Sequence, residues 1–108
     1  MIASRFTFAS VAALAATVAA TLALAAGAPH EVTIEGMQFQ PASLTVHRGD
    51  TVTWKNADLV PHTATAKGRF DSGNIAPGKS YSRKMEQPGE FDYVCSYHPG
   101  MHAKLVVR

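Results

Sequence analysis

The sequence predicts an all-β protein, an antiparallel Greek-key β-sandwich of about seven to eight strands that follows an N-terminal leader. From residue 30 onward, apolar and polar residues alternate in short runs, which is the period of a half-buried strand. Glycine, proline, asparagine and aspartate interrupt these runs at short intervals. The same region lacks the 3.6-residue apolar repeat of an amphipathic helix. Short strands joined by turns therefore account for it.

The first half of this region predicts four strands, over residues 30–35, 37–39, 43–46 and 51–56. The clearest of these, T-V-T-W-K-N, places Val52 and Trp54 on one face. The turn His47-Arg48-Gly49-Asp50 precedes it.

The second half begins with an extended piece over residues 62–66. Residues 67–78 are rich in Gly, Asn, Asp and Pro, and we expect them to run as a surface loop. Strands are predicted over residues 79–85, 90–95 and 102–108. The run E-F-D-Y-V-C sets Phe91, Tyr93 and Cys95 on one inward face, so that Cys95 stands where a core strand enters a loop.

Residues 1–25 are typical of a secretory signal peptide. Arg5 precedes an apolar, alanine-rich stretch, and Ala23-Leu24-Ala25 forms a small-residue cleavage site that makes Ala26 the first mature residue. A cut after Ala28 also fits the small-residue rule, but it places Pro29 directly after the cut. The stretch is about 16 residues long, short of the ~20 needed to span a bilayer, which disfavours a retained membrane anchor. We expect a periplasmic domain over residues 26–108.

The charge balance and the cysteine count of this single domain exclude some functions and structural features. The chain has 108 residues, with 10 Lys and Arg against 8 Asp and Glu, and its charges form neither a basic stripe nor an acidic tail. Binding of nucleic acid is therefore not expected. A single cysteine cannot form an internal disulfide, and a lone thiol in an oxidising compartment is a liability unless it is buried or ligated.

The run Cys95-Ser96-Tyr97-His98-Pro99-Gly100-Met101 carries the chemistry. A thiolate, an imidazole and a thioether, three residues apart, form a soft ligand set that one tight loop can converge on an ion. Pro99 and Gly100 favour a stiff, sharply turned loop. His62, after Pro61 on a distant connection, is the candidate for a second imidazole.

Copper suits this set best. A thioether is a poor ligand for structural zinc, and non-haem iron prefers a carboxylate. No Asp or Glu lies within the cysteine loop, and none adjoins His62 in the sequence. The other histidines are weaker candidates: His47 lies in a turn, His102 points away from the ion if Met101 points toward it, and His30 follows a proline.

The chain resembles the cupredoxins, and most closely their amicyanin and plastocyanin branch. The matching residues are 49–56, Pro61-His62 and 91–101, and the short Cys-x₂-His-x₂-Met spacing is the amicyanin form. The resemblance implies one type 1 copper ion with three equatorial ligands and a weak axial one: His62, Cys95 and His98, and then Met101. It also implies a monomer that carries single electrons between transient redox partners, such as a dehydrogenase or a cytochrome, without acting as an enzyme.

Two residues depart from the family pattern. Thr63 stands where asparagine often braces the cysteine loop, and its hydroxyl can still bridge the two loops. Tyr97 stands where amicyanins have proline, and its N–H could reach the sulfur of Cys95, which would raise the reduction potential. We expect the electron to leave through His98, within an apolar docking patch that includes Pro61, Pro99 and Gly100.

Two other functions use the same ligands. A periplasmic copper-delivery protein would bind copper and pass it on. A copper enzyme would need an open coordination position or a second copper, which Met101 and the short chain disfavour.

Overall fold

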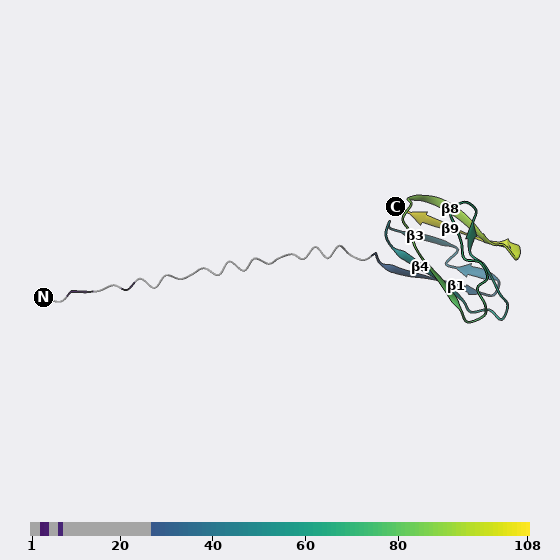
Figure 1. Ribbon diagram of the computed structural model, residues 1–108, viewed down its shortest axis with the longest axis horizontal. Coiled ribbons are helices and arrows are strands. Elements are labelled where there is room, and N and C mark those ends of the chain that lie inside the picture. The colour runs from purple at the N-terminus through teal and green to yellow at the C-terminus, as the bar shows by residue number, and fades with distance from the viewer. Residues whose placement is uncertain (1–2, 5–6, 8–26) are drawn as a thin grey trace.

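The structure, a computed structural model, describes residues 3–4, 7 and 27–108. The predicted leader, residues 1–25, lies outside the described residues except at those three positions. All regular structure in the described part is strand, which confirms the all-β class (Figure 1). The strands are β1 (Pro29–Glu35), β2 (Gln38–Gln40), β3 (Ser43–Val46), β4 (Thr51–Asn56), β5 (Thr65–Ala66), β6 (Phe70–Asp71), β7 (Ser80–Lys84), β8 (Gly89–Cys95) and β9 (His98–Val107).

These strands form two mixed sheets, in the orders β2-β1-β4-β7 and β3-β9-β8-β5-β6. The predicted β-sandwich is confirmed, and most of its strand pairs are antiparallel as expected. Two pairings differ: β1 pairs with β4, and β3 with β9, in parallel. The chain leaves the first sheet after β2, contributes β3 to the second, and returns as β4 beside β1. The described region has nine strands rather than seven to eight, since the predicted surface loop adds the two-residue strand β6.

That segment, residues 67–78, does more than cross the surface. Phe70 lies in β6, and both Phe70 and Ile75 are buried in the core. Ile75 also exchanges two backbone hydrogen bonds with His62, with N···O distances of 3.1 and 2.7 Å. The predicted surface loop therefore packs under the loop that carries His62. Two apolar residues in a polar stretch were the signal for this.

The core lies between the two sheets and follows the predicted alternation. Val52 and Trp54 of β4 are fully buried, and so are Tyr93 and Cys95 of β8. The ring of Trp54 packs within 6 Å of three other rings, those of Phe70, Tyr81 and Tyr93. Aromatic packing of this kind fixes β4 and β8 face to face. Both strands run toward the end of the sandwich that holds the β8–β9 turn, far from the C-terminus (Figure 1).

Candidate metal centre

The predicted ligands come from three parts of the fold. His62 lies in the connection from β4 to β5, Cys95 ends β8, and His98 begins β9. Val94 of β8 pairs with His102 of β9, and the next residue, Cys95, pairs with His98. The register of the two strands therefore shifts between Val94 and Cys95. Residues 99–101 therefore bulge out of the ladder. Met101, at the end of this bulge, is buried.

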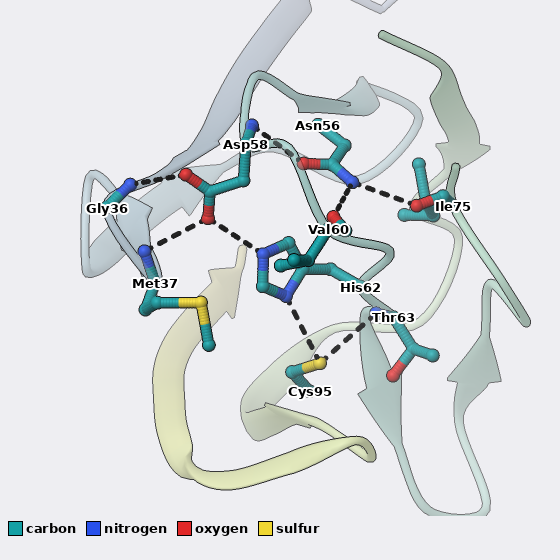
Figure 2. A network of polar contacts seen from close by, with 9 residues as sticks. All are labelled: Gly36, Met37, Asn56, Asp58, Val60, His62, Thr63, Ile75 and Cys95. Atoms are coloured by element: carbon teal, nitrogen blue, oxygen red, sulfur yellow. Dashed lines mark hydrogen bonds and ion pairs between the residues drawn. The ribbon is translucent and has the colours of Figure 1, made fainter. Parts of the chain in front are cut away.

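His62 and Cys95 are brought into contact. Both side chains are fully buried, and the Nδ1 of His62 lies 3.6 Å from the Sγ of Cys95 (Figure 2). A first-row metal ion bonds nitrogen at ~2.0 Å and sulfur at ~2.3 Å, so two such ligands on one ion stand about 3.5–3.7 Å apart. The separation in this protein fits a shared ion.

His98 and Met101 lie near His62 and Cys95, but the four side chains do not yet form a complete ligand set. The rings of His62 and His98 lie 5.3 Å apart, centroid to centroid, and are inclined at 63°. His98 is half-buried, and Met101 shares a groove with Met37 and His102. Within the described residues, no three His, Cys, Asp or Glu side chains stand at metal-binding spacing. The structure thus assembles the buried pair and leaves the other two predicted ligands at its rim.

Asp58 orients the imidazole of His62. Its carboxylate accepts a hydrogen bond from the Nε2 of His62 at 2.8 Å, on the side of the ring away from Cys95 (Figure 2). Because a carboxylate only accepts, the proton lies on Nε2, and the lone pair of Nδ1 faces the sulfur. A carboxylate therefore does touch His62, although none adjoins it in the sequence. The signal was an aspartate four residues earlier in the same loop.

The same carboxylate accepts two backbone hydrogen bonds, from the N–H groups of Gly36 and Met37 at 2.7 and 3.0 Å. Desolvation by itself would raise the pKa of Asp58. The hydrogen bonds from Met37, His62 and Gly36 outweigh it, so the pKa lies below the usual value for aspartate. Asp58 is therefore ionised and committed to these three donors, rather than available as a base.

The sulfur of Cys95 accepts one backbone hydrogen bond, from the N–H of Thr63 at 3.3 Å. The expected hydrogen bond from the N–H of Tyr97 is not among those that this sulfur makes in the described region. The side chain of Tyr97 turns outward, where its hydroxyl donates to Oδ1 of Asn74 at 3.1 Å. Thr63 therefore has the role toward sulfur that we expected of Tyr97.

The hydroxyl of Thr63 bridges the two loops, as its position suggests. It accepts the N–H of Ser96 at 2.8 Å and lies 2.9 Å from the hydroxyl of the same residue. Thr63 is buried, so these bonds are largely shielded from water. The loop of His62 and the turn after Cys95 are thus held together without any metal.

Several apolar residues are exposed at this end of the sandwich. The predicted patch residues Pro61, Pro99 and Gly100 are exposed. The sequence reading missed three further apolar side chains near them, which are exposed by 94%, 42% and 42%: Leu59, Val60 and Met37. The pair Leu59-Val60 in a loop just before Pro61 was the available signal. Of the other histidines, His47 and His102 are exposed and His30 bonds Asp50, as expected of residues outside the site.

A mixed β-sandwich with a buried thiol and imidazole in contact at one end is the class of fold and site found in the small copper-binding sandwiches. The Cupredoxin-like domain profile matches residues 6–107. The chain therefore belongs to the cupredoxin-like family.

Relatives agree with this assignment. Amicyanin-alpha of Methylorubrum extorquens is 34% identical over 113 residues, which cover 90% of this chain and 95% of that protein. Chloroplastic plastocyanin of Tetradesmus obliquus is 36% identical over 85 residues, which cover 65% of this chain and 58% of that protein. A solved Cu(I) form of an amicyanin mutant superposes with a TM-score of 0.70 at 33% identity, and the match covers 76% of this chain and 83% of that one.

Proposed function

We propose that this protein is a small blue copper protein that carries single electrons between redox partners. The observation that supports this best is the buried contact between Nδ1 of His62 and Sγ of Cys95 at 3.6 Å. The proposed ligands of one type 1 copper ion are His62, Cys95, His98 and the weaker Met101. Binding of the ion would draw His98 and Met101, both at the rim of the buried pair, into the set.

Copper in such a site supplies exchange of one electron between Cu(I) and Cu(II). The residues of this chain hold the site rigid. The N–H of Thr63 fixes the sulfur of Cys95, and the carboxylate of Asp58 fixes the ring of His62. Ligands that are already held in place need little rearrangement when the charge of the ion changes. Burial of both side chains excludes water from the sulfur.

His98 is the proposed exit for the electron, because it is the half-exposed member of the ligand set. The docking patch consists of six exposed residues: Met37, Leu59, Val60, Pro61, Pro99 and Gly100. An uncharged apolar patch of modest size suits brief encounters with a dehydrogenase or a cytochrome.

We also propose that residues 1–25 are removed on export and that residues 26–108 act as a monomer in the periplasm. Binding of nucleic acid is not part of the proposed role, since Lys and Arg exceed Asp and Glu by only two. In the described part of the chain, no helix has the length and hydrophobicity that crossing a membrane requires.

Copper delivery is the second candidate function. The groove beside the site favours it, because the thioethers of Met37 and Met101 and the imidazole of His102 all line it. Soft donors at an opening could pass Cu(I) to a partner. A carrier gives reversible voltammetry and keeps its copper in both oxidation states, whereas a delivery protein loses copper to a chelating partner.

The test of the main proposal is addition of Cu(II) to the protein that lacks residues 1–25. We expect an intense blue colour that the Cys95→Ser variant does not develop. A pale solution from the unmodified domain would contradict the proposed function.

A further inference from the structure

Two aspartates stand at opposite ends of β4 and make the same set of contacts. Asp50 precedes the strand, and Asp58 follows it. Each accepts two backbone N–H groups and the Nε2 of one histidine. For Asp50 the donors are Ala28, His47 and His30, each at 2.8 Å. For Asp58 they are Gly36, Met37 and His62, at 2.7, 3.0 and 2.8 Å. Only the second histidine faces the candidate metal centre.

The turn that holds Asp58 has an unusual backbone. Gly36 and Met37 both have positive φ, 63° and 58°, at the tip of the β1–β2 hairpin. Methionine rarely adopts this conformation. Two successive N–H groups in left-handed geometry point the same way and form a small anion-binding concavity. The carboxylate of Asp58 occupies that concavity, so the turn and the carboxylate hold each other.

A second side chain fixes the loop from the other direction. Asn56 is fully buried, and its Oδ1 accepts the N–H of Asp58 at 2.9 Å. Its Nδ2 donates to the carbonyl oxygens of Val60 and Ile75 at 2.8 and 2.9 Å (Figure 2). The connection that carries both Asp58 and His62 is therefore braced along its length, and Asp58 cannot turn away from the imidazole without breaking these bonds.

We infer that Asp58 is a positioning residue of the metal centre, which keeps the proton of His62 on Nε2 and presents an electron-rich Nδ1 toward Cys95. This inference rests on the proposed copper function. A carboxylate on the far nitrogen of a metal-binding imidazole fixes the tautomer and raises the basicity of the ligand. A more basic imidazole stabilises Cu(II) relative to Cu(I), and so lowers the reduction potential.

The first measurement needs no copper. We expect ¹⁵N NMR of the metal-free protein to show His62 with a proton on Nε2 and none on Nδ1. A proton on Nδ1 would overturn the inference. Because this outcome is independent of metal binding, it tests Asp58 even if the domain takes up no copper and the proposed function fails.

The second measurement compares Asp58→Asn with Asp50→Asn, using the copper ion alone as the probe. Asparagine keeps an acceptor for the imidazole and removes the charge. We expect Asp58→Asn to raise the reduction potential and to weaken copper binding by about tenfold or more. Asp50→Asn should leave both unchanged, because its histidine is not a ligand. If both variants lose stability and neither changes the potential, Asp58 is only a structural brace and the inference is wrong, while the blue copper function stands.

Discussion

Thr63 and Ser96 are joined by two hydrogen bonds across the candidate metal centre. The N–H of Ser96 donates to Oγ1 of Thr63 at 2.8 Å, and the two hydroxyl oxygens lie 2.9 Å apart. The N–H of Thr63 donates to the sulfur of Cys95. Thr63 therefore uses its side chain to join two loops and its backbone to hold the sulfur, and mutation can separate these tasks.

We expect Thr63→Val to lower the free energy of unfolding by about 1–2 kcal/mol, because the N–H of Ser96 loses its acceptor in a partly buried position. The N–H of residue 63 remains, so the blue colour should persist. Urea unfolding of the metal-free protein measures the first effect, and the visible spectrum measures the second. Thr63→Ser keeps the hydroxyl and is the matched variant. An equal loss of stability in both would show that the hydroxyl is unimportant.

Tyr97→Pro should leave the reduction potential almost unchanged. Proline removes the N–H of residue 97, but that group makes none of the hydrogen bonds to Cys95 in the described structure. The variant also loses the hydrogen bond from the exposed Tyr97 hydroxyl to Asn74, with a small effect on stability. Voltammetry of the two copper-loaded proteins is the measurement. A clear fall in potential would restore Tyr97 as a donor to the sulfur.

Much of the fold follows from local pattern. The alternation of Phe91, Tyr93 and Cys95 correctly placed the cysteine at the end of a buried strand, because the period of a strand is fixed by its geometry. The spacing of His98 from Cys95 correctly placed the two residues on one tight turn. Features that depend on a few consecutive residues could be predicted.

The contacts that tune the site could not be predicted from local pattern. Asp58 reaches His62 only because the distant Gly36–Met37 turn supplies two donors, and no local pattern records that pairing. The donor to Cys95 comes from Thr63, 32 residues away, rather than from its neighbour Tyr97. The parallel pairing of β1 with β4 likewise depends on which sheet β3 joins. These features are set by tertiary packing.

Leu59→Lys should slow electron exchange between two copies of the protein. Leu59 is 94% exposed in the docking patch, so the substitution should change the free energy of unfolding by less than about 0.5 kcal/mol. Two added positive charges that meet across a patch oppose close approach, and we expect the self-exchange rate to fall by about tenfold or more at low salt. NMR line broadening in mixtures of the oxidised and reduced protein measures the rate.

Thr45→Lys provides the same change of charge away from the patch. Thr45 is exposed on β3 and pairs with Val106, near the C-terminal end of β9. Its self-exchange rate should stay close to that of the unmodified protein. Equal slowing in both variants would mean that net charge, and not the patch around Leu59, controls the encounter.

Alkaline pH should reveal the buried hydroxyl of Tyr93. Desolvation by burial raises the pKa of Tyr93 to about 12, against ~10 in an unfolded chain. The folded state therefore holds this proton more tightly. This proton contributes up to about 2–3 kcal/mol to the free energy of unfolding. The contribution is fully present below pH ~10 and is lost as the pH rises toward 12. Urea unfolding at a series of pH values from 9 to 12, a range that spans both of these pKa values, measures the loss.

Tyr93→Phe removes the ionisable group, so the free energy of unfolding of this variant should fall less steeply over the same pH range. Tyr97→Phe is the control, because the side chain of Tyr97 is 49% exposed and lies outside the core. That variant should keep the steep loss of the unmodified protein. Ionisation of Tyr93 would place a charge in the apolar core, where its ring packs against that of Trp54. If Tyr93→Phe and the unmodified protein nevertheless lose stability in parallel, a group other than Tyr93 governs the alkaline transition.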